Sequence, residues 1–180
     1  PRRRRVCLGD RLMRIFIVGP MASGKSTLGK KLAQKLQIDF IDTDKEIEKK
    51  AGADISWIFE VEGEEGFRER EKKALRESSE KDNVVISTGG GAVMASENRK
   101  LMSSQGKVIY LKTPIQLQLD RTLRDQSRPL LGEGDKEKTI RALKKERDPL
   151  YREIACITIE QKEKNNYQIL QEILDKLNRK

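Results

Sequence analysis

The chain has 180 residues and a net charge of +9, with 37% charged and only 4% aromatic residues. This length fits one domain with a mostly aliphatic core. The lack of any histidine excludes histidine acid–base catalysis, histidine-based metal sites and Ser-His-Asp triads. No apolar run approaches the roughly 18 residues of a membrane span, and the start lacks the apolar stretch of a secretory signal. We therefore expect a cytoplasmic protein without membrane contact.

A cluster of arginines begins the chain. Residues 1–12 contain five arginines and one aspartate and so carry +4, which leaves +5 on residues 13–180. A basic arm can bind nucleic acid, but no aromatic residues interleave with this one, so we do not expect a nucleic-acid partner. Met13 directly precedes the first predicted strand. We interpret residues 1–12 as a disordered extension or an expression remnant, and residues 13–180 as a single domain.

Short apolar runs alternate with longer amphipathic segments through the rest of the chain. This alternation is typical of an α/β fold in which helices cover a five-stranded parallel sheet. Apolar residues at helical spacing predict a helix after the first run, and another at the end of the chain whose core face includes Tyr167 and Leu170. The predicted strands are Ile15–Val18, Phe40–Ile41, Val84–Ser87, Val108–Leu111 and Ile157–Ile159.

The first predicted strand runs directly into Gly-Pro-Met-Ala-Ser-Gly-Lys-Ser-Thr at residues 19–27. The spacing matches the P-loop, whose glycines let backbone amides turn toward phosphate oxygens. Lys25 supplies positive charge to the β- and γ-phosphates, and the Ser26 hydroxyl can ligate Mg²⁺. The following helix directs the positive end of its dipole at the same phosphates. The pattern predicts a nucleotide site at Ala22, Ser23, Gly24, Lys25, Ser26 and Thr27.

The second predicted strand is followed by Asp42-Thr43-Asp44. Residues at the carboxyl end of a parallel strand face the ligand crevice of an open α/β sheet. One carboxylate can hold Mg²⁺ through water, and the other can accept hydrogen bonds from substrate hydroxyls. The alternative is that Asp42 or Thr43 only caps a helix over Lys45–Ala51. Capping and ligation are compatible, and both interpretations stay open.

The third predicted strand ends in Gly89-Gly90-Gly91, where many P-loop proteins place an acidic Mg²⁺ ligand. Three glycines are often only a flexible turn, but here they let backbone amides approach a ligand closely.

A polar, glycine-containing stretch from Asp125 to Lys138 includes Arg128. Long loops in compact domains are often lids, and the alternative is a disordered surface insertion.

Arginines are the candidates for holding an acidic substrate. Arg68 lies in a predicted helix, and Arg147 precedes Asp-Pro-Leu-Tyr. Guanidinium binds carboxylate with two parallel hydrogen bonds, which lysine cannot imitate. A surface role is the usual alternative for any arginine in so charged a chain, and spacing alone does not choose among them.

A resemblance does choose among the arginines. Six segments, in the same order, resemble shikimate kinases and span residues 14 to about 160. The helix with Phe-Arg-x-x-Glu, the glycine triplet and Arg-Pro-Leu-Leu are more specific than the P-loop, which many enzymes share. The segments are Gly-Pro-Met-Ala-Ser-Gly-Lys-Ser-Thr, Asp-Thr-Asp, Gly63-Glu-Glu-Gly-Phe-Arg-Glu-Arg-Glu71, Ser87-Thr-Gly-Gly-Gly91, Arg128-Pro-Leu-Leu131 and Arg147-Asp-Pro-Leu-Tyr151.

The resemblance implies a three-layer P-loop kinase fold with a mobile lid at about 124–138. On the nucleotide side it implies that Lys25 and the loop amides hold ATP phosphates and that Ser26 ligates Mg²⁺, with Asp42 in or near the metal's second shell. Arg121 would stack near adenine, and Arg128 would move with the lid to the γ-phosphate.

On the acceptor side, the resemblance implies a shikimate-binding region at about 42–70. Asp44 would bind shikimate hydroxyls and serve as a catalytic residue with Lys25 and Arg128. Arg68 and Arg147 would hold the carboxylate of shikimate, and Gly90 and Gly91 would contact its ring through their backbone.

These features predict an ATP- and Mg²⁺-dependent kinase that phosphorylates the 3-hydroxyl of shikimate. We expect a monomer. The alternatives are another P-loop small-molecule kinase, such as a gluconate kinase or a nucleoside monophosphate kinase, and a nucleotide-regulated protein that binds nucleic acid through its basic arm. The pair of arginines favours an acid as substrate.

Overall fold

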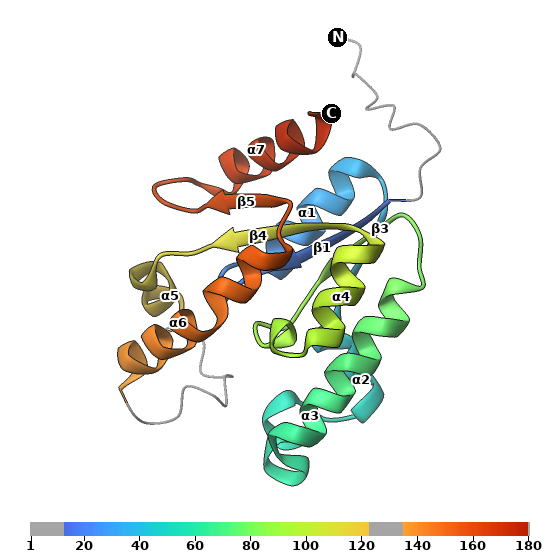
Figure 1. Ribbon diagram of the computed structural model, residues 1–180, viewed down its shortest axis with the longest axis vertical. Helices are drawn as coiled ribbons and strands as arrows, with labels where there is room; N and C mark the ends of the chain where they lie inside the picture. Colours follow the sequence, from blue (N-terminus) through green and yellow to red (C-terminus); the bar gives the residue numbers. More distant parts are fainter. Residues whose placement is uncertain (1–12, 123–134, 180) are drawn as a thin grey trace.

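A computed structural model describes residues 13–122 and 135–179 of the chain. Its centre is a parallel five-stranded sheet with the strand order β2-β3-β1-β4-β5 (Figure 1). All five predicted strands are confirmed, each within one residue of its predicted bounds. The strands are β1 (Arg14–Val18), β2 (Asp39–Asp42), β3 (Val84–Ser87), β4 (Lys107–Lys112) and β5 (Ile157–Glu160).

Helices cover both faces of the sheet and give three layers (Figure 1). Helices α1 and α7 pack on one face, and α3, α4 and α6 contribute to the core on the other. The α/β expectation is therefore confirmed. The helical segments are α1 (Lys25–Leu36), α2 (Thr43–Ala51), α3 (Ile55–Ser79), the 3₁₀ turn η1 (Ala92–Met94), α4 (Ser96–Gln105), α5 (Ile115–Thr122), α6 (Lys136–Ile154) and α7 (Asn166–Asn178).

The apolar face predicted for the last helix is correct except at one position. Leu170, Ile173 and Leu177 of α7 are buried against the sheet and α1. Tyr167 is 68% exposed, so its predicted place in the core is wrong. It lies in the first turn of α7, directly after the loop from β5, where the helix begins outside the core. One amphipathic repeat predicts a helix face but not where that face leaves the core.

The register of the strands brings the carboxyl ends of β1, β2 and β3 to one edge of the sheet. Ile17 of β1 and Asp42 of β2 both pair with Ser87 of β3. The P-loop, the aspartate pair and the glycine triplet follow these strand ends directly. The topology thus places three distant sequence segments beside one another, as an open parallel sheet does at its ligand-binding edge.

The predicted lid falls almost entirely outside the described residues. Residues 123–134, with Arg128, are among those not described. At the other end, the predicted boundary at Lys138 is wrong, because α6 already begins at Lys136. The Asp135 side chain caps this helix by accepting a hydrogen bond from the Lys138 amide at 3.1 Å.

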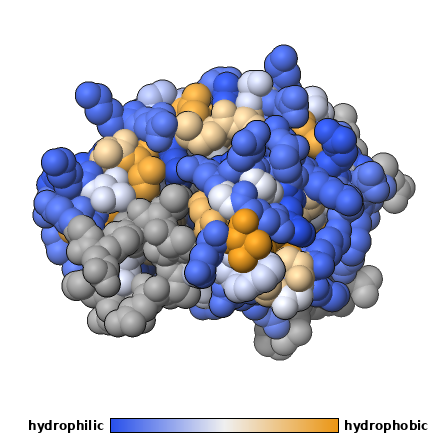
Figure 2. Space-filling model, turned by 90° about the horizontal axis from the view of Figure 1, so that it is seen from below, coloured by the Kyte–Doolittle hydropathy of each residue, from blue (hydrophilic) through white to orange (hydrophobic). Residues whose placement is uncertain are grey.

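The face in Figure 2 is mostly hydrophilic, with small separate hydrophobic areas, as the 37% charged composition predicts. Among the described residues, no helix is long and apolar enough to cross a bilayer.

Candidate active site

The loop between β1 and α1 has a backbone that depends on glycine. Gly19 has a φ of 151°, and a Cβ there would lie 2.8 Å from the carbonyl oxygen of Leu111 on β4. Gly24 has a φ of 80° and forms the N-cap of α1. Any larger residue at either position would strain this path. The loop therefore lies tightly on the sheet and leads directly into the N-terminus of α1.

Lys25 is held across this loop. Its ammonium donates hydrogen bonds to the carbonyl oxygens of Gly19 at 2.9 Å and Pro20 at 2.8 Å. Beside the loop lies a cavity of about 400 Å³, which we call the P-loop cavity. Five of the six predicted loop residues line it, together with Arg121; they are Ala22, Gly24, Lys25, Ser26 and Thr27.

Ser23 is the exception among the predicted loop residues. It is buried, and its carbonyl oxygen accepts a hydrogen bond from the Gln161 side chain at 2.7 Å. The Arg121 guanidinium donates to the Ala22 carbonyl at 2.8 Å and to the Gln161 side-chain oxygen at 3.2 Å. Gln161, which the sequence did not single out, thus ties Arg121 and the P-loop to the end of β5.

Asp42 caps α2, which confirms the capping role, and also contacts the P-loop, while its metal-binding role stays a prediction. One carboxylate oxygen accepts hydrogen bonds from the amides of Asp44 at 3.1 Å and Lys45 at 3.4 Å, and so caps α2. The other accepts a hydrogen bond from the Ser26 hydroxyl. The correction is that α2 begins at Thr43, two residues earlier than predicted, which places Asp44 in its first turn.

The pairing of Ser26 with Asp42 sets the chemistry available for a cation. Both donors are oxygens, which suit Mg²⁺, and Mg²⁺ commonly takes one or two protein ligands plus phosphate oxygens and water. Within the described ranges, no group of three or more acidic or cysteine side chains could hold a metal alone. These residues therefore fit a metal that arrives with a phosphorylated ligand.

Asp44 lines the P-loop cavity and has an unsatisfied oxygen. Its Oδ1 atom is buried and has no hydrogen-bond partner among the described residues. Burial raises the pKa of Asp44 to about 6, and the nearby carboxylates of Asp42 and Glu71 add to this effect, while Lys25 opposes it. A buried acceptor without a donor is costly, so this oxygen favours a ligand hydroxyl.

A second cavity of about 340 Å³, which we call the arginine cavity, lies beside α2, α3 and the glycine triplet. Arg68 lines it and donates hydrogen bonds to Glu71 at 2.7 Å and to Glu64 at 3.0 Å. A Cβ at Gly91 would lie 2.6 Å from Cζ of Arg68. Glycine is therefore required here for the guanidinium to lie against the backbone.

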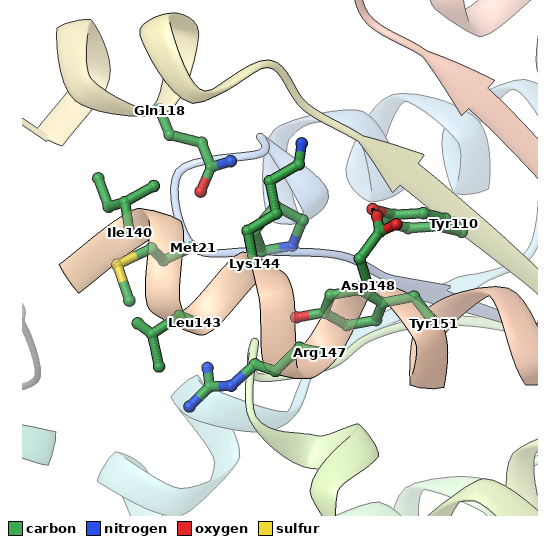
Figure 3. A pocket seen from close by; sticks show the side chains of 10 residues that line it. Met21, Tyr110, Gln118, Ile140, Leu143, Lys144, Arg147, Asp148 and Tyr151 are labelled. Atoms are coloured by element: carbon green, nitrogen blue, oxygen red, sulfur yellow. Dashed lines mark hydrogen bonds between the residues drawn. The ribbon is translucent and has the colours of Figure 1, made fainter. Parts of the chain in front are cut away.

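Arg147 reaches the same cavity from α6. The residue is only 6% exposed, and its Nε atom is buried without a hydrogen-bond partner in the described part of the chain. In Figure 3 the Arg147 guanidinium points away from Tyr110 and Asp148, which lie on the other side of the residues drawn. A desolvated guanidinium with a spare donor is suited to binding a carboxylate.

The two cavities meet. Met21, Ser26, Asp44 and Gly90 line both of them. Gly90 is close to the P-loop itself, because a Cβ on it would lie 3.2 Å from the Met21 nitrogen. A phosphate bound at the P-loop would therefore lie beside a ligand of the arginine cavity, with Asp44 between them. This arrangement suits transfer of a phosphoryl group.

Most of the predicted site residues thus gather around two connected cavities. Arg128 lies outside the described residues, and Ser23 lies behind the loop rather than in the P-loop cavity. Several lining residues had no role predicted from the sequence. Glu71 stands three residues after Arg68 on one helix face, a spacing that signals an ion pair, whereas Gln161 had no local signal. The unassigned lining residues include Glu48, Phe59 and Glu71 in one cavity and Thr88 and Asn166 in the other.

Comparison with known proteins decides the family. The model of the family described as shikimate kinase matches residues 21–178. The chain belongs to the shikimate kinase family. It is 50% identical to shikimate kinase 1 of Pectobacterium atrosepticum over 164 residues, which cover 91% of this chain and 95% of that protein. It is 51% identical to shikimate kinase of Pasteurella multocida over 162 residues, covering 89% and 93%.

Solved structures agree with this shikimate kinase assignment. Shikimate kinase from Acinetobacter baumannii, solved in complex with shikimate, superposes with a TM-score of 0.90 at 48% identity, over 93% of this chain and 94% of that one. A gluconokinase from Sinorhizobium meliloti superposes at 0.63 with 16% identity, over 93% and 92%, which shows a common fold only. As a shikimate kinase family member, the chain is a P-loop kinase that transfers phosphate from ATP.

Proposed function

We propose that the chain transfers the γ-phosphoryl group of ATP to the 3-hydroxyl of shikimate at the boundary of the two cavities. The observation that carries this proposal is that Asp44 and Gly90 line both the P-loop cavity and a cavity that holds two arginines. Shikimate combines a carboxylate with ring hydroxyls, so it matches an arginine pair at one end and an unsatisfied carboxylate oxygen at the other.

In the P-loop cavity, Lys25 and the loop amides would bind the phosphates, and Arg121 would lie beside the adenine. Ser26 is the candidate ligand for Mg²⁺, with Asp42 oriented toward it by their hydrogen bond. When bound, Mg²⁺ neutralises charge on the phosphate oxygens. Lys25 would act on the same charge, because its ammonium already lies over the loop.

In the arginine cavity, Arg68 and Arg147 would bind the carboxylate of shikimate. Asp44 would accept a hydrogen bond from the hydroxyl that attacks, through its unsatisfied Oδ1. With a pKa of about 6, Asp44 is mostly ionised at neutral pH and able to accept that bond. Backbone groups of Gly90 and Gly91 would contact the ring, since both residues line the cavity.

Catalysis would come from position and charge rather than from a covalent intermediate. Phosphoryl transfer passes through a loose transition state whose charge lies on the transferred oxygens. Lys25 and the N-terminus of α1 would stabilise that charge, with Arg128, outside the described residues, as a further candidate. Asp44 would direct the acceptor oxygen and receive its proton during or after transfer.

The test is an ATP-consumption assay against shikimate, gluconate and nucleoside monophosphates in parallel, with Mg²⁺ present and then removed by chelation. Among these acceptors we expect turnover only with shikimate, and we expect that turnover to be lost when Mg²⁺ is chelated. Faster turnover with gluconate or a nucleotide would refute the proposed acceptor, and unchanged turnover after chelation would refute the metal requirement.

A monomeric state and a cytoplasmic location also stay predictions. Light scattering after size exclusion chromatography measures the oligomeric state.

A further inference from the structure

Tyr151 makes a hydrogen bond that joins α6 to the glycine triplet. The residue is 2% exposed, and its hydroxyl donates to the carbonyl oxygen of Gly90 at 2.5 Å. Burial raises the pKa of Tyr151 far above its ordinary value, and the adjacent Arg147 counteracts this effect only in part. The hydroxyl therefore keeps its proton at any physiological pH and remains a donor.

The acceptor of this bond belongs to a peptide that borders both cavities. Gly90 lines both cavities and Gly91 lines the arginine cavity. The peptide that joins them is planar and trans, so fixing its carbonyl on the α6 side also turns the Gly91 amide to the opposite side. Neither glycine has a side chain that could hold this peptide. Its orientation depends on bonds made by neighbours, and Tyr151 makes one of them.

Stacking on a second aromatic ring holds the Tyr151 side chain in place. Its ring stacks on Tyr110, with ring centroids 4.9 Å apart. The Tyr110 hydroxyl donates to Asp148, which also accepts from Arg152 at 2.7 Å. Figure 3 shows Tyr110, Asp148 and Tyr151 gathered at one end of this group, with Arg147 extending away from them.

We propose that Tyr151 is a positioning residue for the acceptor substrate: its hydroxyl orients the Gly90–Gly91 peptide at the boundary of the two cavities, while its helix supplies Arg147 one turn earlier. The proposal rests on the proposed function, since it assigns Tyr151 to shikimate rather than to ATP. A purely structural tyrosine would affect stability, but it would not distinguish between the two substrates.

The test is Tyr151→Phe, which removes the hydroxyl and keeps the ring. We expect the KM for shikimate to rise about fivefold to tenfold because the peptide loses its donor, while the KM for ATP stays within about twofold of wild type. Tyr110→Phe is the matched control, because it removes a hydroxyl from the same stacked pair but one that faces Asp148. It should leave both KM values unchanged.

Each outcome is informative. An unchanged shikimate KM in Tyr151→Phe, equal changes for both substrates, or the same selective change in Tyr110→Phe would overturn the inference. If wild type does not use shikimate, the proposed function fails instead. Should Tyr151→Phe not fold, proton NMR of the shikimate-bound wild type decides. A slowly exchanging Tyr151 hydroxyl proton close to the Gly90 and Gly91 protons supports the bond, and its absence refutes it.

Discussion

Single residues in this site owe their properties to burial and to their neighbours. Asp44 and Arg147 each have a buried polar atom without a partner in the described residues, and their placement is consistent with opposite ends of one ligand. Asp42 combines the N-cap of α2 with a hydrogen bond to Ser26. The helix cap and the contact with the P-loop therefore use the two different oxygens of one carboxylate, and conservative substitutions should separate the two roles.

Replacing Lys25 with alanine should lower kcat on the order of 100- to 1,000-fold, because a preorganised charge next to the transferred group is lost. Its bonds to the Gly19 and Pro20 carbonyls lie within the loop, so the circular dichroism spectrum should stay native. The measurement is steady-state turnover with both substrates saturating. Near-normal turnover in a folded variant would exclude the proposed role of Lys25.

Arg147→Lys should raise the KM for shikimate by about tenfold or more, because an ammonium cannot make the paired contact of a guanidinium. The KM for ATP should change little. Arg152→Lys, on the next turn of α6 and paired with Asp148, is the control and should leave both values unchanged. Equal effects of Arg147→Lys on the two substrates would contradict the assignment.

Asp44 makes stability depend on pH. Its folded pKa of about 6 exceeds the ordinary value of 3.8, first through burial. The folded state therefore binds more protons than the unfolded state between these values, and the free energy of unfolding falls as pH rises through this window. In the ligand-free protein, the free energy of unfolding of Asp44→Asn should exceed that of wild type by on the order of 2 kcal/mol near pH 7.5. Near pH 4 the two values should be almost equal.

Urea titrations at the two pH values measure this difference. Asp39→Asn, at the exposed start of β2, is the control and should show no such dependence. If Asp44→Asn and wild type differed in free energy of unfolding by the same amount at both pH values, ionisation of Asp44 would not destabilise the folded state.

At the scale of elements, the glycine triplet and α3 act as one unit. Gly91→Ala would place a methyl group against the Arg68 guanidinium, whose Cζ is 2.6 Å from that point. The side chain can move, so the melting temperature should change little, but the KM for shikimate should rise several-fold. A large loss of stability with unchanged KM would contradict this account.

Gly106→Ala is the matched control for that substitution. Its Cβ would meet the Arg14 carbonyl oxygen at 2.5 Å, and backbone cannot move aside as a side chain can. Gly106 lies just before β4, at the opposite end of the strands from the P-loop. This variant should lose stability by about 1–3 kcal/mol and keep both KM values. Thermal melts and initial rates measure the two effects.

For the whole molecule, the sequence predicted the parallel sheet, its helical layers and about half of the residues that line the two cavities. This succeeded because short strand and P-loop patterns are local, and because parallel strand ends meet at one edge. Gln161 escaped prediction, since its contact with Ser23 joins residues 138 positions apart. Tyr167 was misplaced because helical periodicity does not show where a helix leaves the core.

A further prediction concerns the arginine-rich start of the chain, residues 1–12. The described residues that line the two cavities all lie between Met21 and Asn166. Removal of residues 1–12 should therefore leave kcat and KM unchanged. Steady-state rates of the full and shortened chains give the comparison. A marked loss of turnover would show that the arm takes part in the reaction.

The most direct test of phosphoryl transfer between the two cavities is the identity of the product. Purified protein, ATP, Mg²⁺ and shikimate are incubated together, and phosphorus–proton correlation NMR locates the new ester. The account predicts one product, with phosphorus coupled to the proton on C3 of shikimate, formed in step with ADP. Phosphate on another hydroxyl, or ADP and free phosphate without an ester, would contradict it.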